Sequence, residues 1–201
     1  MTYHGGNQLL DIPQILDASN LSAGMHVADL GCGRTGYVVF PLAKVIGAHG
    51  MVYAVDIMKD VLEEVHKRAA LEGFAQVFTV WADLERPGAI SIPEHTLDVV
   101  FLVNTLFHFS NVEPVLDEAL RLMAPKSRLV VVDWTHNELP FGPKQEQLVD
   151  FARVDAWART HHFTVQNRFA PGDHHQGVVY FKHDKLPEQH ADKKATIWRL
   201  G

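Results

Sequence analysis

A glycine-rich turn is the stretch of this sequence whose residue types and spacing could do chemistry. Gly31, Gly33 and Gly36 follow the apolar run 25–30, and the apolar stretch 37–46 follows them. This order is typical of a buried parallel strand, a tight turn and a helix. Glycine adopts positive φ without a Cβ penalty and lets backbone N–H groups approach a ligand closely. A helix N-terminus adds partial positive charge, so the turn predicts a site for the anionic or carboxylate end of a ligand.

An acidic residue stands where a second strand would end. Asp56 lies twenty positions after Gly36 and closes the apolar run 50–55. At the tip of a second strand, a carboxylate can accept both hydroxyls of a ribose. Dinucleotides and S-adenosylmethionine both use this layout. The glycines alone could serve only compact packing, but together with Asp56 they indicate a nucleoside-bearing cofactor.

Asp29 separates these two ligand classes, because dinucleotide folds usually have a small or apolar residue at its position. The sequence Val-Ala-Asp-Leu-Gly-Cys-Gly at 27–33 resembles the first motif of class I S-adenosylmethionine-dependent methyltransferases, similar to the ubiquinone/menaquinone type. In that family the acidic residue lies close to the amino-acid end of the cofactor. The turn departs from the family by one extra residue, since Arg34 and Thr35 stand where a single residue is usual. Arg34 then either faces the cofactor carboxylate or is solvated.

The resemblance implies further cofactor contacts. Asp83 matches an acidic residue that lies beside the adenine in the family, although it could instead cap a helix or a turn. Leu84 would press on the adenine ring, and Asn104 would form the floor of the cleft. The implied cofactor-binding residues are Asp29, Gly31, Cys32, Gly33, Arg34, Gly36, Asp56, Ile57, Asp83, Leu84 and Asn104.

Methyl transfer from a sulfonium is an in-line displacement in which the enzyme holds the acceptor atom about 3–3.5 Å from the methyl group. A general base is needed only where the acceptor loses a proton. His108 is the leading candidate for this catalytic role, with His136 and Asp133 behind it, and its alternative is a polar residue at a helix start. The histidine pairs 161–162 and 174–175 do not predict a metal site, because adjacent side chains on an extended segment point opposite ways.

An α/β scaffold must position these residues. The resemblance implies a doubly wound, mostly parallel seven-stranded Rossmann-like sheet with a C-terminal antiparallel hairpin, which nicotinamide dehydrogenases usually lack. The patterns predict strands at 25–30, 50–56, 76–81, 97–103, 128–134, 163–169 and 177–182 and a turn at 124–127. They also predict a short helix within 6–21, with Pro13 in its first turn, and helices at 37–46, 58–72, 111–122 and 145–161.

Length and composition limit the function further. With 201 residues, one methyltransferase domain over 1–183 is expected, with a loosely ordered tail at 184–201. Its leading helix, within 1–21, would cover either the cofactor cleft as a lid or the sheet. A net charge of −6 without a basic run argues against nucleic acid as a partner. The lack of a signal peptide, of an apolar run of ~20 residues and of any cysteine besides Cys32 predicts a cytoplasmic protein without a membrane span.

We therefore predict an S-adenosylmethionine-dependent methyltransferase that acts on a small-molecule acceptor. Its cleft is open or is closed by the leading helix, by the loop 135–144 or by a second subunit, so a homodimer is one expected assembly. Two alternatives remain at this point. The absence of a clear catalytic base would suit a non-catalytic cofactor-binding or scaffolding protein, and Gly-x-Gly-x-x-Gly would suit a NAD-dependent oxidoreductase.

Overall fold

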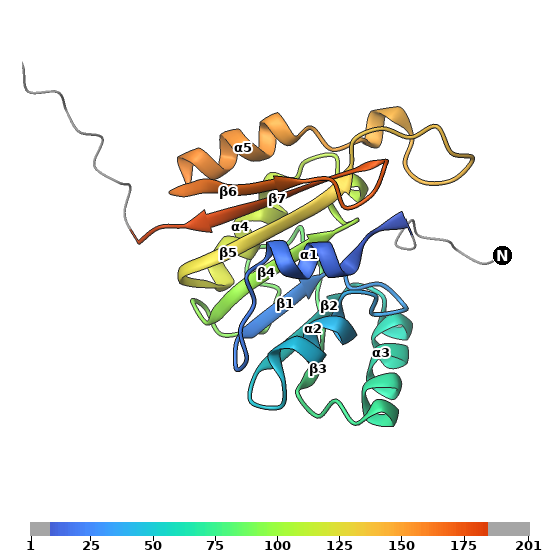
Figure 1. Ribbon diagram of the computed structural model, residues 1–201, viewed down its shortest axis with the longest axis vertical. Helices are drawn as coiled ribbons and strands as arrows, with labels where there is room; N and C mark the ends of the chain where they lie inside the picture. The colour runs from blue at the N-terminus through green and yellow to red at the C-terminus, as the bar shows by residue number, and fades with distance from the viewer. Residues whose placement is uncertain (1–8, 185–201) are drawn as a thin grey trace, which may run out of the picture.

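One mixed sheet of seven strands forms the centre of the protein, and helices cover both of its faces (Figure 1). The computed structural model describes residues 9–184. The strand order is β3-β2-β1-β4-β5-β7-β6, which confirms the predicted doubly wound sheet with its C-terminal hairpin. The strands are β1 (His26–Leu30), β2 (Met51–Asp56), β3 (Val77–Trp81), β4 (Leu97–Val103), β5 (Met123–Trp134), β6 (Phe163–Phe169) and β7 (His175–Lys182).

The strand order reverses between β1 and β4. Strands β1 to β5 pair in parallel, whereas β7 runs antiparallel to both β5 and β6. From β1 the chain builds outward through β2 and β3, then returns to place β4 on the other side of β1. In Figure 1 the arrowheads of the parallel strands lie toward one edge, and the arrowhead of β7 points the other way. Ligands of open α/β sheets bind at this edge, beside the reversal point.

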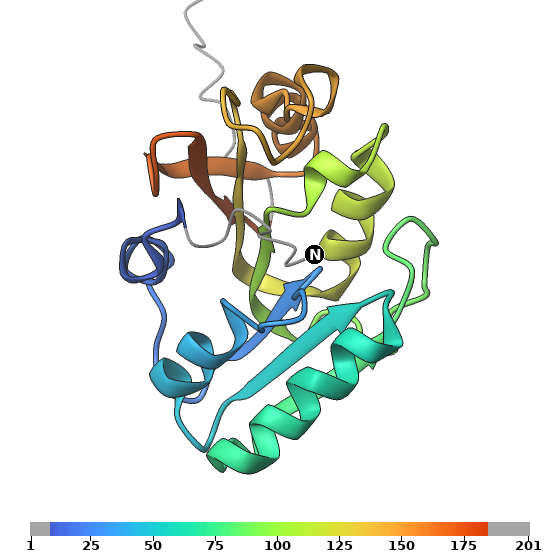
Figure 2. The same cartoon turned by 90° about the vertical axis from the view of Figure 1, so that its right-hand side faces the viewer.

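The parallel strands are almost continuously apolar because both faces of the sheet are covered. In β4, Val99 and Phe101 join the core beneath α1 (Ile12–Ala18), α2 (Val39–Ile46) and α3 (Lys59–Glu72). The alternate residues Val100 and Leu102 join the core beneath α4 (Glu113–Leu122) and α5 (Phe151–Thr160). Figure 2 shows α1 and α4 on opposite sides of the sheet.

The helix ends follow their capping residues. Asp11 precedes α1, and its carboxylate accepts a hydrogen bond from the Gln14 N–H at 3.0 Å. Gly47 and Gly73 end α2 and α3 with φ of 69° and 75°. Ile15 of α1 is fully buried in the core on this face of the sheet. Within residues 9–184, no helix is long and apolar enough to cross a membrane.

One predicted helix is interrupted in the structure. Residues 145–161 do not form one helix but split into the 3₁₀ turn η3 (Gln145–Gln147) and α5. Leu148 is extended between them, and α5 begins only after Asp150, whose carboxylate caps the Ala152 N–H at 2.9 Å. The short leading helix predicted within 6–21 occupies Ile12–Ala18 and has Pro13 in its first turn, as expected, and residues 6–8 of that range lie outside the described part.

Two strand boundaries also differ from the prediction. The turn predicted at 124–127 is an irregular stretch inside β5, where the pairing with β4 passes from Met123 to Arg128 and Lys126 has φ of 58°. β7 begins at His175 rather than at 177, because His175 still pairs with Trp134. The predicted tail, 184–201, lies outside the described residues except for Asp184.

Candidate functional site

The glycine turn leaves the end of β1 with the expected backbone conformation. Gly31, Gly33 and Gly36 have φ of 86°, 62° and 53°, which favours glycine at each position. A Cβ on Gly31 would lie 2.7 Å from the Thr105 side chain. Thr105 follows β4, and its hydroxyl donates to the Leu30 carbonyl at 2.9 Å. The turn is therefore packed tightly against the loop that follows β4.

Most backbone N–H groups of the turn donate hydrogen bonds within the chain. The sequence had instead predicted that they would be available to bind an anionic group of a ligand. The Gly31 and Cys32 N–H groups donate to the Val55 carbonyl at 2.8 and 3.0 Å. The Gly33 N–H donates to Asp56 Oδ2 at 3.1 Å, and the helix α2 starts only at Val39. Side-chain carboxylates, rather than an array of amides, are thus the main polar groups at this edge.

Asp29 is the buried carboxylate of the site. Its side chain is 2% exposed, and within residues 9–184 its Oδ1 atom has no hydrogen-bond partner. Burial raises the pKa of Asp29 to about 8, and the nearby charge of Asp56 adds to the shift. A buried carboxylate oxygen without a donor is costly, so this atom marks the place for a donor from a ligand.

Asp56 is half-buried at the tip of β2, on the strand next to Asp29. Its two oxygens accept hydrogen bonds from the Gly33 N–H and, at 2.9 Å, from the Met58 N–H. These backbone bonds fix the carboxylate, and each oxygen retains acceptor capacity for a ligand hydroxyl. Ile57 and Trp81 beside it are 55% and 52% exposed, which provides apolar surface next to the polar tip.

The two residues after β3 have different environments. Asp83 is partly exposed, and its Oδ1 accepts the Glu85 N–H at 3.0 Å, as in the alternative turn role. Leu84 is 6% exposed and packs in the core beneath α4 and α5. Its side chain therefore offers little surface to a ligand.

The loop after β4 carries the other predicted residues. Asn104 is buried with φ of 52°, and its N–H donates to the Val132 carbonyl at 2.8 Å. His108 ends the 3₁₀ turn η2 (Leu106–His108) and reaches solvent, with its ring centroid 3.9 Å from that of Phe107. Partial desolvation lowers the pKa of His108, and the charge of Asp56 opposes this shift. The charge of Asp56 thus affects the pKa of His108.

Asp133, considered above as a catalytic base, instead holds this loop in place. Its carboxylate is fully buried and accepts the Thr105 and Leu106 N–H groups at 3.1 and 2.8 Å and that of Trp134 at 2.9 Å. Burial raises its pKa to about 7, although these backbone hydrogen bonds oppose the shift. With its oxygens occupied by the backbone, Asp133 positions the loop of His108.

Arg34 pairs with a residue other than the two carboxylates, and Cys32 is buried beside them. Arg34 forms an ion pair with Asp60 of α3 at 2.5 Å, with both side chains more than half exposed. Cys32 has a buried thiol, and burial raises its pKa. The structure thus brings together the glycine turn, Asp29, Asp56, Asn104 and His108.

This arrangement fits S-adenosylmethionine. The unpartnered oxygen of Asp29 suits an α-ammonium group, Asp56 suits ribose hydroxyls, and exposed Ile57 suits an adenine face. A known family shares the pattern. The model of a methyltransferase domain family matches residues 21–187, most of the chain. The chain belongs to this methyltransferase domain family.

Relatives of this methyltransferase domain include enzymes from bacterial biosynthesis. Aklanonic acid methyltransferase DauC of a Streptomyces species is 29% identical over 54% of this chain and 51% of its own. The ubiquinone/menaquinone biosynthesis C-methyltransferase UbiE of Hydrogenovibrio crunogenus is 26% identical over 68% of this chain and 52% of its own. The methyltransferase domain thus spans about half the length of these curated relatives.

A solved structure matches nearly from end to end. The SAM-dependent methyltransferase from Aquifex aeolicus superimposes with a TM-score of 0.76 at 25% identity, covering 89% of this chain and 93% of its own. Together with the antiparallel β7, this match sets the NAD-dependent oxidoreductase alternative aside. The family's cofactor, S-adenosylmethionine, agrees with the prediction from Asp29.

Sequence reasoning missed some residues of this edge. Thr105 has no signal of its own beyond its place after Asn104. A ring cluster of Trp134, His136, His174 and His175 also forms here, with the Trp134 and His175 rings 4.3 Å apart. The neighbouring pair 174–175 was visible in the sequence, but its meeting with Trp134 depends on the pairing of β5 and β7.

Proposed function

We propose that this methyltransferase domain binds S-adenosylmethionine and transfers its methyl group to a small-molecule acceptor. The observation that carries the proposal is the buried Asp29 carboxylate, whose Oδ1 has no partner within residues 9–184, next to Asp56 at the end of β2. A protein that only needed a stable turn here would not leave a buried carboxylate oxygen unpaired, since such an atom costs about 1–3 kcal/mol.

Each residue has a separate part in this proposal. Asp29 accepts from the ammonium group of the cofactor's amino-acid end, and Asp56 accepts from the ribose hydroxyls. Ile57 and Asp83 border the adenine, and Asn104 lines the floor between β1 and β4. Once bound, the cofactor supplies an electrophilic methyl group on a sulfonium, so the chain contributes mainly orientation and exclusion of water.

His108 is the proposed general base where the acceptor carries a proton. It lies at the solvent-facing rim, and its lowered pKa keeps the imidazole neutral near pH 7. Acceptors without a proton to lose would need no base. A requirement for His108 would therefore distinguish hydroxyl, amine and carbon acids from other acceptors.

The names of the relatives support a small acceptor. One acts on aklanonic acid and another serves quinone biosynthesis. The chain's net charge of −6 also disfavours a polyanionic partner. A homodimer and a cytoplasmic location stay predictions at this point.

Calorimetric titration tests cofactor binding directly. The full chain is titrated separately with S-adenosylhomocysteine and with NAD. We expect saturable heat from S-adenosylhomocysteine and none from NAD. Heat from NAD alone would refute the proposal.

Turnover tests the non-catalytic alternative. The chain, loaded with labelled S-adenosylmethionine, is offered a panel of hydroxylated, amine and quinol compounds, and label transfer is measured. We expect transfer to at least one member. Tight cofactor binding without transfer to any panel member or cell extract would favour a non-catalytic cofactor-binding protein.

A further inference from the structure

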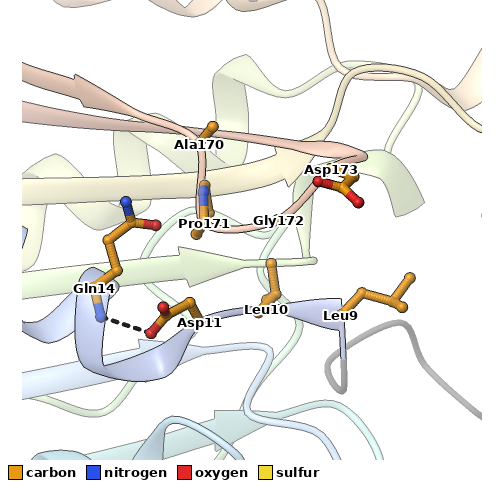
Figure 3. Close-up of a pocket in the computed structure, with 8 residues that line it drawn as sticks. All are labelled: Leu9, Leu10, Asp11, Gln14, Ala170, Pro171, Gly172 and Asp173. Carbon is orange, nitrogen blue, oxygen red and sulfur yellow. Dashed lines mark hydrogen bonds between the residues drawn. The ribbon is translucent and has the colours of Figure 1, made fainter.

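A hollow opens beside the predicted cleft, between the start of α1 and the turn that joins β6 to β7. Its volume is about 530 Å³, and residues 9–11, Gln14 and 170–173 line it. Figure 3 shows these two segments facing each other across the hollow. The Asp11 N–H donates to the Pro171 carbonyl at 2.6 Å and ties them together. Because β7 is antiparallel, this turn lies at the edge where the parallel strands end.

A buried histidine borders the hollow. His175 is 3% exposed, yet across residues 9–184 neither of its ring nitrogens finds a hydrogen-bond partner. Gly172 lines the hollow, and a Cβ on it would lie 2.1 Å from the Leu9 carbonyl oxygen and 3.7 Å from His175 Nδ1. Buried polar atoms are normally satisfied by protein, water or ligand. His175 thus offers two unused hydrogen-bonding atoms directly behind the lining of the hollow, next to Gly172 and the Leu9 carbonyl.

Aromatic rings lead from solvent to His175. His136 is exposed, and its ring centroid lies 4.9 Å from that of the half-buried His174. Trp134 follows, with ring centroids 5.8 Å from His174 and 4.3 Å from His175. Trp134 is 1% exposed and lies behind the other rings, so His136 and His174, which follows the lining residue Asp173, provide the ring surface that a flat, conjugated molecule could contact.

The charges around the hollow restrict the ligand further. Among residues 9–184, its lining contains Asp11 and Asp173 but neither lysine nor arginine. Burial, together with the neighbouring His174 and His136, lowers the pKa of His175 to about 4, so its ring is neutral. A neutral imidazole has one donor and one acceptor, which matches a hydroxyl group. No set of three or more His, Cys, Asp or Glu side chains in residues 9–184 is placed to hold a metal ion.

The distance to the proposed methyl position also fits a small ring compound. β4 ends at the floor of the cleft, and β5 separates it from β7. Neighbouring strands lie about 4.8 Å apart, so the end of β4 and the start of β7 are separated by roughly 10 Å. A molecule of two or three fused rings spans about that gap.

We infer that the hollow is the distal half of the acceptor site and that His175 recognises the hydroxyl of an uncharged, hydroxylated aromatic acceptor. This inference rests on the proposed function. It assigns the acceptor a chemical class that the family and the relatives leave open.

Matched probes test it on the full chain saturated with S-adenosylhomocysteine. 1-Naphthol, 1-methoxynaphthalene and 1-naphthoate are titrated by calorimetry. One neutral hydrogen bond should make 1-naphthol bind about threefold to tenfold tighter than its methoxy analogue. The naphthoate should bind weakest, because Asp11 and Asp173 repel it.

His175→Phe should remove the preference for the hydroxyl. This substitution keeps a ring against Trp134 and deletes the two unpartnered nitrogens, so the melting temperature should be equal or higher. His161→Phe is the matched control. Its ring stacks on Trp157 with centroids 4.5 Å apart, but it lies at the opposite end of β6 from the hollow. The control should retain the preference.

Nitrogen-15 NMR of the histidine rings gives a second readout on the unaltered chain. Addition of 1-naphthol should shift the His175 ring nitrogens. Equal affinities for 1-naphthol and its methoxy analogue, preference for the naphthoate, or unshifted His175 nitrogens would each overturn the inference. S-adenosylhomocysteine binding is measured first in the same samples. Its absence would refute the proposed function, and the naphthol titrations would still decide the role of His175.

Discussion

At the scale of single residues, burial changes the protonation state of the Asp29 carboxylate. Burial raises the pKa of Asp29 to about 8, with a further contribution from the charge of Asp56. Near pH 7 Asp29 is therefore largely protonated. A cationic ligand group would favour ionised Asp29 and displace its proton.

Cofactor binding should therefore release a proton. At pH 7, titration of S-adenosylhomocysteine in buffers of different ionisation enthalpy should give heats that vary with the buffer. At pH 9, Asp29 is already ionised, so this variation should be largely lost. Asp29→Asn should abolish it at both pH values and weaken binding. Buffer-independent heat from the unaltered chain at pH 7 would contradict the proposed role of Asp29.

Asp56→Ala should reduce affinity for S-adenosylhomocysteine at least tenfold. Hydrogen bonds to charged groups contribute about 1.5–3 kcal/mol each, and this variant removes the acceptor of the ribose hydroxyls. Asp56→Asn should be milder because it keeps one acceptor oxygen. Asp60→Ala is the control, since Asp60 pairs at the surface with Arg34. Unchanged affinity in a well-folded Asp56→Ala protein, checked by thermal melts, would place the cofactor elsewhere.

His108→Gln should lower kcat about 10²–10⁴-fold for acceptors that lose a proton, with S-adenosylhomocysteine affinity unchanged. Desolvation lowers the pKa of His108 despite the opposing charge of Asp56. The ring therefore stays neutral and active until the pH falls below its ordinary value of about 6.5. The pH profile of kcat should fall only on that acidic side, and the variant should lose this limb. An unaltered kcat in the variant would exclude His108 as the base.

The residues that the sequence located well are those fixed by local spacing. Gly31, Asp29 and Asp56 stand at strand ends that an apolar pattern reveals, and all of them meet at one edge. The position of the Leu84 side chain could not be predicted from local spacing. A single residue that follows a strand can point either to the ligand or to the core. His175 and Trp134 meet only because β7 pairs with β5.

At the scale of elements, one buried glutamate organises the segment between β3 and β4. Glu118 of α4 is buried, and its oxygens accept the Gly88 and Ile90 N–H groups at 2.9 and 3.1 Å. Arg121 on the same helix pairs with Glu118 at 2.6 Å. These hydrogen bonds hold the loop that follows Asp83 in place, although this loop contains no helix.

Glu118→Gln should lower the free energy of unfolding by about 1–3 kcal/mol at pH 7, because it removes a charged acceptor. Burial favours the neutral form of Glu118, but the hydrogen bonds from Arg121 and the two amides outweigh it and lower its pKa. Its stabilisation is therefore present above the unfolded-state pKa and is lost as the pH falls through the lower folded-state value. Urea unfolding at pH 7 and pH 3 measures this.

The difference between the unaltered chain and Glu118→Gln should shrink at pH 3. The exposed Glu85, in the same loop, provides the control Glu85→Gln, which should change stability by less than about 0.5 kcal/mol. An equally large difference at both pH values would show that packing, rather than charge, explains the role of Glu118.

Element boundaries were harder to predict than element types. Helical periodicity continues through 145–161, but Leu148 is extended and the Val149 N–H bonds to the Trp134 carbonyl at 3.1 Å. A tertiary hydrogen bond thus breaks a pattern that local sequence favours. Asp150 was a visible capping residue, and its position was the one local signal for the true start of α5.

At the scale of the whole molecule, the alternation of strands and helices was sufficient to predict the sheet and its reversal point. The pattern does not reveal which distant segments of the chain contact each other. The hollow exists because the start of α1 meets the β6–β7 turn, joined by the hydrogen bond between Asp11 and Pro171. No local signal links positions so far apart in the chain.

The insertion of β7 between β5 and β6 also has a consequence for synthesis on the ribosome. Among the strands of residues 9–184, the one that covers β5 is the last to be translated, so shorter nascent chains lack the partner of β5 along 128–134. β6 is translated before β7, and within the described residues β7 is its only partner. Such edges recruit other chains. A chain that ends shortly before residue 175 therefore has the parallel strands of the sheet but leaves the edge of β5 open to pairing with other chains.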